Sequence, residues 1–378
     1  MSWKETEFEN LYSAPSKNGL TRPASIRGNG YKMINMGELF ANDRIGDLEM
    51  ELVPMNEKEL STMLVEPGDL LFARQSLVLA GAGKCSIVMS VNEPTTFESH
   101  LIRVRLNQQI ADPAFYYYYF RSPICRIRSI VTQGVQAGIR GNDLKKLRVH
   151  VPDIVNQQRI ASILSTYDDL IENNRRRIQL LEEAARLLYR EWFVHLRFPG
   201  HEHVRIVDGV PEGWEKKTLG DVAPLSYGKA LKQDDRVSGP FPVYGSSGIV
   251  GTHVKALIPG PTIIVGRKGN VGSVYWSSED CHPIDTVYYI DSSRCSFHLY
   301  YALQHMSFIN TDVAVPGLNR NFAHSCSVLI PEQKIYRSFE DTVAPMHLQI
   351  DLLCKENVAL TQARDLLLPR LMNGEIAV

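Results

Sequence analysis

The sequence has little of several features that mark common classes of protein. Its six cysteines are scattered over 378 residues without a CxxC pair, which favours reduced thiols over disulfides or a zinc site. No apolar run approaches the roughly 20 residues that span a bilayer, and the first ten residues lack the pattern of a signal peptide. Lys and Arg number 41 against 42 Asp and Glu. We therefore expect a cytoplasmic protein with no membrane segment and no overall basic surface, although a local basic face stays open.

Motifs that carry catalysis are also missing. Residues 79–84 hint at a phosphate-binding loop, but Val78 stands where that motif needs a glycine, and Cys85 replaces its Ser or Thr. His201 and His203 would need further ligands to hold a metal. No serine-hydrolase, zinc-protease or dinucleotide-binding motif occurs. We predict a binding protein with no catalytic residue, no metal ligand and no cofactor in this chain.

An internal repeat is the most informative feature that is present. When the two halves are aligned, Gly138-Ile139 falls on Gly317-Leu318 and Pro152 falls on Pro331. In each half, short apolar runs separated by Gly, Pro and Asn predict a mainly antiparallel sheet with flanking helices. The fold class is therefore predicted as α/β (α+β), with two similar domains that each end in a long helix. The aromatic run 115–120 could stack on bases, but its sequence context favours a packed helix.

Each long helix carries an apolar seam. Apolar residues recur at alternating spacings of three and four over more than four heptads, which is typical of a coiled coil. The seam residues are Leu164, Tyr167, Ile171, Asn174, Ile178, Leu181 and Leu188 in the first helix and Met346, Ile350, Leu353, Asn357, Leu360 and Leu367 in the second. We predict that the two helices pair as an antiparallel coiled coil about a pseudo-twofold axis.

Three residues qualify that prediction. Asn174 and Asn357 interrupt the two seams, either to fix the register of the pair or as asparagines tolerated near a surface. Pro345 is expected to kink or restart the second helix, so that only its later part pairs well. A helix of about 35 residues spans roughly 50 Å, which matches about 15 base pairs of B-DNA. The globular domains could then touch sites about one DNA turn or more apart.

These patterns divide the chain into four parts. The first globular domain takes residues 1–151 and the first long helix residues 152–198. The second globular domain takes residues 199–330 and the second long helix residues 331–378.

Two Gly-rich loops in each half are the candidate binding elements. Glycine lets the backbone approach a ligand closely, whereas Arg, Lys, Gln and Asn suit phosphates or base edges. The candidate residues are Arg74, Gln75, Lys84, Gln136 and Arg140 in the first half and Arg267, Lys268, Asn270, Asn319 and Arg320 in the second. An ordinary exposed turn remains the alternative for any one of them. A local basic cluster could add affinity, from Arg121, Arg126, Arg128, Arg140, Lys145, Lys146 and Arg148.

Several segments make the chain similar to the specificity subunit of type I restriction-modification enzymes. The most specific is the ending 364–376, and Gln157-Gln158 opens the first long helix as in that family. Further matches lie at 210–214, 242–251 and 331–335, although the last lacks the double glutamine. Ser246 and Ser247, within one of these segments, and Lys229 join the candidate DNA-binding residues.

The resemblance implies a role for each part of the chain. Each globular domain would be a target recognition domain that reads one half of a bipartite double-stranded DNA sequence. The coiled coil would set the spacing and dock two methyltransferase (modification) subunits, and restriction subunits would join the full complex. S-adenosylmethionine, ATP and magnesium would bind those partner subunits, and this chain would be non-catalytic. A DNA-binding adaptor of another defence or regulatory complex is the alternative.

Overall fold

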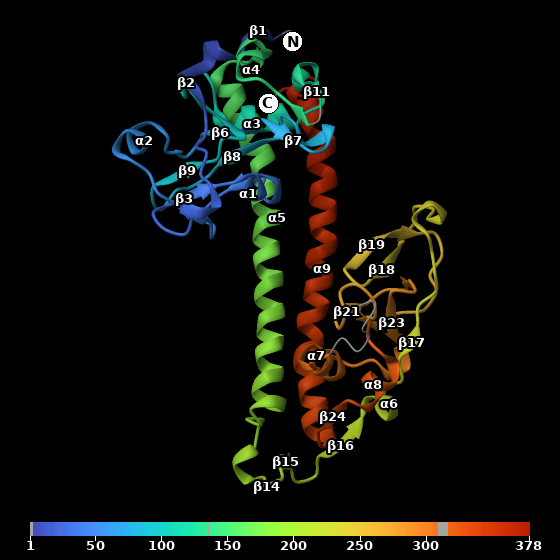
Figure 1. Cartoon of the computed structure of the whole chain (residues 1–378). Helices are drawn as coiled ribbons and strands as arrows, with labels where there is room; N and C mark the ends of the chain where they lie inside the picture. The colour runs from blue at the N-terminus through green and yellow to red at the C-terminus, as the bar shows by residue number, and fades with distance from the viewer. Residues whose placement is uncertain (1–2, 135, 309–316) are drawn as a thin grey trace. The chain divides into compact units, whose positions relative to one another are not determined.

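The computed structural model describes residues 3–134, 136–308 and 317–378, and the chain forms two compact units (Figure 1). Unit 1 comprises Met1–Glu172 and Asn357–Val378, and unit 2 comprises Asn173–Glu356. Both long helices are divided between the units. The units therefore cut across the four-part division expected from the sequence, whose boundaries stay a prediction.

Unit 1 is built on a five-stranded sheet in the order β2-β10-β6-β8-β4, in which only β4 and β8 pair in parallel. These strands are β2 (Tyr12–Asn18), β10 (Leu101–Leu106), β6 (Leu70–Ala73), β8 (Cys85–Val88) and β4 (Arg44–Ile45). Three small sheets surround it. The first pairs β1 (Lys4–Glu7) with β13 (Arg148–Val151), and the second has the order β5 (Glu51–Val53), β3 (Tyr31–Ile34), β9 (Thr95–Phe97). The third has the order β11 (Thr132–Gln133), β12 (Ala137–Gly138), β7 (Gln75–Ser76). The short helices are α1 (Met36–Ala41), α2 (Glu57–Thr62), α3 (Pro113–Arg121) and α4 (Gly141–Lys146), with 3-10 turns η1 (Phe8–Leu11), η2 (Ala24–Ile26), η3 (Leu79–Gly81) and η4 (Arg126–Ile130).

The aromatic run 115–120 forms α3 and fills the core of unit 1. The Asp112 side chain caps the helix by accepting a hydrogen bond from Phe115 N at 2.8 Å, and proline at the first helical position suits that start. All six aromatic side chains are buried. Gln157 ties the following long helix to this helix start, because its Oε1 accepts from Asp112 N at 2.8 Å. The run is therefore a packed helix and not a surface for stacking bases.

Unit 2 repeats this plan with a four-stranded sheet in the order β17-β23-β20-β21. These strands are β17 (Ser226–Tyr227), β23 (Val287–Ile290), β20 (Thr262–Gly266) and β21 (Val274–Ser277). Its small sheets are β16 (Glu215–Thr218) with β24 (Ser327–Ile330); β19 (Gly248–His253), β18 (Phe241–Gly245) and β22 (His282–Pro283); and β14 (Ile206–Val207) with β15 (Val210–Pro211). Its short helices are α6 (Leu219–Val222), α7 (Phe297–His305) and α8 (Arg320–Ser325), with 3-10 turns η6 (His201–His203), η7 (Gln233–Asp235) and η8 (Ser292–Arg294).

Equivalent backbone contacts show that the two units are copies. Gly19 N donates to Leu101 O in unit 1, and Gly228 N donates to Val287 O in unit 2. A Cβ at either glycine would lie about 2 Å from a carbonyl oxygen, so neither position admits another residue without a shift. The predicted fold class, two similar mixed α/β domains with mainly antiparallel sheets, is confirmed.

The long helices are α5 (Ile154–Tyr189), which continues into a π-helical turn η5 (Arg190–Val194), and α9 (Gln333–Met372). In unit 1, Ile160 and Leu164 share a core with Leu371. In unit 2, Tyr189 packs on Phe339 with ring centroids 6.0 Å apart. Early residues of α5 thus meet late residues of α9, and late ones meet early ones, so the helices run antiparallel within each unit. Every residue of the expected seams is buried or partly buried.

The structure contradicts the expected restart of the second helix at Pro345 and the expectation that only its later part pairs well. Helix α9 continues through this residue from Gln333 to Met372. The part before the proline also packs fully, since Phe339 and Val343 are completely buried. Proline removes the hydrogen bond to the carbonyl of Asp341, but both residues are exposed, so water can bond that carbonyl.

A buried ion pair joins the two helices in unit 1. Arg364 of α9 donates to Asp168 of α5, and the two side chains are 15% and 10% exposed. Tyr118 of α3 donates its hydroxyl to the same carboxylate at 2.6 Å. Arg364 also pairs with the exposed Asp365. Because charges are costly to bury, the pair stabilises this arrangement of three helices only while both partners are present.

We expect Arg364→Ala to lower the free energy of unfolding by about 3–5 kcal/mol, because it leaves the Asp168 carboxylate buried without its cation. Urea titration of the full chain measures the change. Asp365→Ala is the matched control, since it removes the exposed partner and should cost under about 1 kcal/mol. Equal effects of the two substitutions would contradict the assignment.

Two buried histidines make unit 2 sensitive to acid. His298 is 2% exposed and its Nε2 has no hydrogen-bond partner in the described part of the chain. His347 stacks on Phe297 with ring centroids 4.3 Å apart, and its Nε2 lies 2.8 Å from the Tyr301 hydroxyl. Burial lowers the pKa of each histidine to about 4. Both are therefore neutral in the folded chain at pH values where the unfolded chain begins to bind protons.

The stability of unit 2 should be complete above pH 6.5 and fall as the pH drops from 6.5 toward 4. Each histidine should contribute about 3 kcal/mol of that loss, because the unfolded state binds the extra proton. Urea titrations at several pH values test this, with the double variant His298→Phe/His347→Phe expected to show a flatter profile. His201→Gln changes an exposed histidine and should leave the profile as it is; an unaltered slope in the double variant would refute the prediction.

Candidate nucleic-acid interface

The two Gly-rich loops predicted in the second half lie against each other in unit 2. Leu318 N donates to Arg267 O at 2.8 Å, and Lys268 forms a β-bridge with Gly317. The loop after β20 is thus joined by backbone contacts to the segment that leads into α8. Candidate residues that are about 50 positions apart in the sequence come together in one place.

Two arginine side chains lie against one aromatic ring at this junction. The guanidinium carbons of Arg267 and Arg320 each lie 5.0 Å from the ring centroid of Tyr227, a residue that is 48% exposed. Arg267 also donates to the carbonyl of Asp285 at 3.1 Å. Within residues 3–134, 136–308 and 317–378, neither guanidinium has a carboxylate within 4.0 Å. Among the described residues, the site therefore presents two positive charges without a carboxylate partner beside one aromatic ring, which suits phosphates or guanine edges.

A serine turn supports the same loop. The Ser246 carbonyl accepts from the Ser273 hydroxyl at 2.6 Å and from the Tyr275 hydroxyl at 3.2 Å. Its own hydroxyl accepts from Asn270 N at 3.4 Å. Ser246 thus positions the backbone around Asn270, while Ser247 beside it is exposed.

The remaining candidates of unit 2 adjoin this cluster. Lys229 is exposed two residues beyond Tyr227, and its backbone carbonyl lies 3.3 Å from the His282 ring. Lys268 is exposed beside Arg267. The Asn319 side-chain Oδ1 accepts from Asn321 N at 2.8 Å and so caps α8, which holds Arg320 at the helix start.

Unit 1 joins its two candidate loops in the same way. Ile139 N donates to Arg74 O at 2.9 Å, and Gln75 pairs with Gly138. Arg74 occupies the place of Arg267, because each backbone N–H donates to the residue directly before a strand: Arg74 N to His100 O before β10, and Arg267 N to Thr286 O before β23. Gln136 lies in the turn between β11 and β12, and Arg140 stands exposed before α4.

Lys84 is held within unit 1. Its ammonium donates to Phe40 O at 2.8 Å and pairs with Asp43 at 3.1 Å. Asp43 also pairs with Arg121 at 2.7 Å. These bonds argue against a direct role of Lys84 or Arg121 in contacting a ligand, whereas Arg126, Lys146 and Arg148 line an open depression on the surface.

The sequence did not single out two residues that organise these loops. Tyr227 carries both arginines of unit 2, and its only signal was an aromatic residue two positions before Lys229. Arg128 donates to the carbonyls of Leu79 and Ala80 at 3.0 and 2.9 Å and so holds the longer loop of unit 1. It appeared in the sequence only as one member of a basic cluster.

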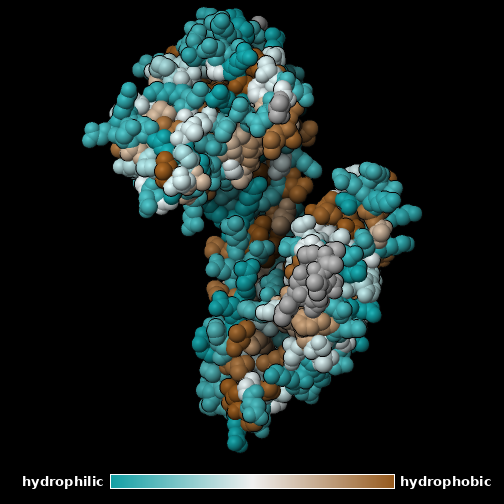
Figure 2. Space-filling model, viewed as in Figure 1, coloured by the Kyte–Doolittle hydropathy of each residue, from teal (hydrophilic) through white to brown (hydrophobic). Residues whose placement is uncertain are grey.

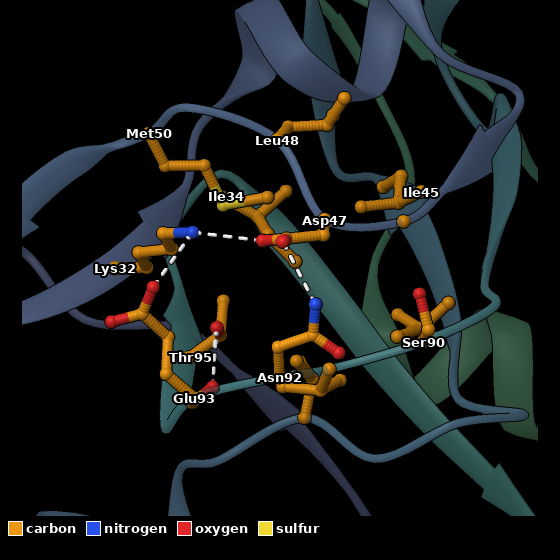
Figure 3. A pocket seen from close by; sticks show the side chains of 14 residues that line it. Lys32, Ile34, Ile45, Asp47, Leu48, Met50, Ser90, Asn92, Glu93 and Thr95 are labelled. Carbon is orange, nitrogen blue, oxygen red and sulfur yellow. Dashed lines mark hydrogen bonds and ion pairs between the residues drawn. The ribbon is translucent and has the colours of Figure 1, made fainter.

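A pocket in unit 1 is too small to bind a ligand (Figure 3). It lies beside β3 and β9, and its volume of about 10 Å³ is room for no more than one water molecule. Figure 3 shows Lys32 between two carboxylates, and the ion pairs to Asp47 and Glu93 measure 2.9 and 2.7 Å. These hydrogen bonds raise the pKa of Lys32. The pocket is closed by its own ion pairs.

The described residues contain no group of three or more His, Cys, Asp or Glu side chains placed to hold a metal ion. In the same part of the chain, no helix combines the length and the apolar character needed to cross a membrane.

Comparison with known proteins identifies relatives of this architecture. The family model described as "Type I restriction modification DNA specificity domain" matches residues 3–183 and 211–341. The MjaIX specificity subunit of Methanocaldococcus jannaschii is 22% identical, with 88% of this chain and 85% of that protein covered. The HindI specificity subunit of Haemophilus influenzae is 25% identical, with 82% and 87% covered. Both are named as subunits of type I restriction enzymes.

A solved structure shows the same fold. The crystal structure of a type I restriction-modification system S subunit from M. genitalium aligns with a TM-score of 0.63 at 19% identity, over 98% of this chain and 96% of that one. The family model matches residues of both units, including their paired loops, most of α5 and the start of α9. The chain belongs to the family of type I restriction-modification DNA specificity domains.

Proposed function

We propose that this chain is the DNA sequence-specificity subunit of a type I restriction-modification complex, and that each globular part reads one half of a bipartite target. One observation carries the proposal. The same backbone bond, Arg74 O to Ile139 N and Arg267 O to Leu318 N, pins two loops together in both units. The side chains that these loops present are those that read base edges or bind phosphates.

The charge of unit 2 supports an anionic ligand. Arg267 and Arg320 share the Tyr227 ring and have no carboxylate partner among the described residues. Two like charges that each lie 5.0 Å from one ring repel each other, and an anion or the acceptor atoms of a base edge beside them would offset that repulsion. A duplex offers both, as phosphate oxygens and as the O6 and N7 atoms of guanine.

The long helices support the spacing and docking roles. At 1.5 Å per residue, the 36 residues of α5 and the 40 residues of α9 extend about 54 and 60 Å. The helix length would set the distance between the two half-sites. Figure 2 shows hydrophobic residues along the exposed surface of the helices. The exposed apolar residues are Val155, Ile163, Leu170, Leu180 and Leu187 on α5 and Leu348, Leu352, Val358 and Leu366 on α9.

These exposed side chains fit docking of methyltransferase subunits, because scattered leucines on a water-exposed helix gain by burial against a partner. Two such subunits would bind, one for each half of the repeat. S-adenosylmethionine, ATP and magnesium would belong to the partners, and restriction subunits would complete the assembly. The chain itself would select the site without catalysing a reaction.

Long-read methylation sequencing of the host genome, with the gene intact and deleted, tests this function. We expect one split motif with a non-specific gap to lose its methyl groups on deletion and to regain them when the gene is restored. If every methylated motif survives the deletion, the chain does not direct a methyltransferase, and the adaptor function takes its place.

Arg267→Ala and Arg320→Ala should each weaken binding of the target duplex by about 1–3 kcal/mol, since each removes a charged donor from the proposed interface. Binding isotherms at fixed salt concentration measure the loss. Arg294→Ala is the matched control, because Arg294 is an exposed arginine of unit 2 beyond the opposite end of β23. Unchanged affinity in both test variants would remove this cluster from the interface.

A further inference from the structure

The loop between β7 and β8 of unit 1 exposes an apolar tip. Leu77, Val78 and Leu79 are 86%, 62% and 51% exposed. We call residues 77–79 the apolar tip. Figure 2 shows hydrophobic surface at the edge of unit 1 where Figure 1 labels β7. Adjacent aliphatic side chains this exposed lose hydrophobic stabilisation in the free protein, which points to a binding partner.

The apolar tip is held in a defined conformation. Arg128 donates to the carbonyls of Leu79 and Ala80, and also to that of Ala82 at 3.3 Å. Val78 N donates to the Ser76 hydroxyl at 3.2 Å, and its carbonyl accepts from Gly81 N at 3.0 Å. A tip fixed by so many bonds loses little conformational entropy on binding. It is preorganised for contact.

The surroundings of the tip indicate what it contacts. It begins two residues after Gln75, which pairs with Gly138 in the loop junction of unit 1. Arg128 connects the tip to η4, where Arg126 lines the open depression together with Lys146 and Arg148. A depression lined by these basic residues beside an apolar tip fits a nucleic acid better than a protein. The phosphates would lie against the basic side chains, and the tip would face the edges of the nucleobases.

Unit 2 has the same framework without this tip. Gly83 N donates to Ala73 O in unit 1, and Gly272 N donates to Gly266 O in unit 2, so the two loops close in the same way. The loop of unit 2 is shorter and presents Lys268 and Asn270 instead. Equal frameworks with different tips are expected where the two copies read different base pairs.

We propose that Leu77 and Val78 recognise an A·T pair in the half-site of unit 1 by packing on the C5-methyl group of thymine. That methyl group is the apolar feature which the major groove presents, and aliphatic side chains are its usual partners. Gln75 at the base of the tip is of the type that hydrogen-bonds adenine in the same groove. The inference rests on the proposed function and names a chemical feature that unit 1 reads.

Replacement of thymine by deoxyuridine tests the inference, because it removes only the methyl group. The full chain, together with the methyltransferase subunits that copurify with it, is titrated with the target duplex found by methylation sequencing. Deoxyuridine replaces each thymine of both half-sites in turn. We expect one replacement to weaken binding about four- to tenfold, which corresponds to losing one or two buried methyl contacts.

The double variant Leu77→Ser/Val78→Ser should bind the unmodified duplex more weakly by a similar factor and show no further loss with deoxyuridine at that position. Replacements in the other half-site should affect the variant and the unaltered chain equally. Ile110→Ser is the matched control: Ile110 is 43% exposed in unit 1, beyond the end of β10 that is remote from the tip. This control should keep both its affinity and its response to deoxyuridine.

Several outcomes would overturn the inference. One is an unaltered chain that binds every deoxyuridine duplex as tightly as the thymine duplex, and another is a variant that keeps the full response. A double variant with normal DNA affinity but without its methyltransferase subunits would assign the tip to a protein contact. A further measurement uses duplexes that carry 2-aminopurine as a fluorescent base. A rise in its fluorescence at one base step, seen only when the tip is intact, would instead indicate that the tip wedges between bases. Failure of the proposed function is distinguished earlier, since no methylated motif would then depend on the gene, and the inference would fall with it.

Discussion

The burial of both long helices in both cores is the constraint on which the rest of the structure depends. Leu164 and Leu371 complete the core of unit 1, and Tyr189 and Phe339 complete that of unit 2. The carboxyl-terminal end of the chain thus packs with strands from its beginning. Neither globular part has a closed core without residues from both helices, so the loops that they carry are positioned by the helix pair. A change in the seam would therefore act on both units.

The duplicated framework separates what must stay constant from what can vary. Backbone bonds close the loops identically, as Arg74 O with Ile139 N and Arg267 O with Leu318 N show. Because these bonds use no side chain, the residues between them can change without loss of the fold. The loops of the two units differ accordingly. In unit 2 two arginines lie against one tyrosine ring, and in unit 1 the longer loop carries the apolar tip. One fold can therefore present two distinct reading surfaces.

The sequence predicted the elements that depend on periodicity and failed where contacts between distant residues decide. The seams and the repeat were visible because burial follows the helical period. The expected restart at Pro345 failed because the effect of a proline depends on whether the carbonyl four residues earlier, that of Asp341, can bond water. The spacing of residues in the sequence does not reveal this. The Tyr227 platform and the bonds of Arg128 join residues far apart in the chain. Basic residues that look alike in the sequence are therefore distinguished only by their partners: Lys84 pairs with the Asp43 carboxylate, whereas Arg267 has no carboxylate within 4.0 Å among the described residues.

The distribution of ion pairs explains how a chain with a net charge of −1 can present a positive surface. Carboxylates such as Asp43, Asp47 and Asp168 are bound to cations within unit 1. Arg267 and Arg320 have no carboxylate partner among the described residues, so the positive charge is local to these loops. Affinity for random DNA comes from phosphate contacts and falls as the salt concentration rises. Selectivity must come instead from base edges, and we propose that the paired loops supply those contacts.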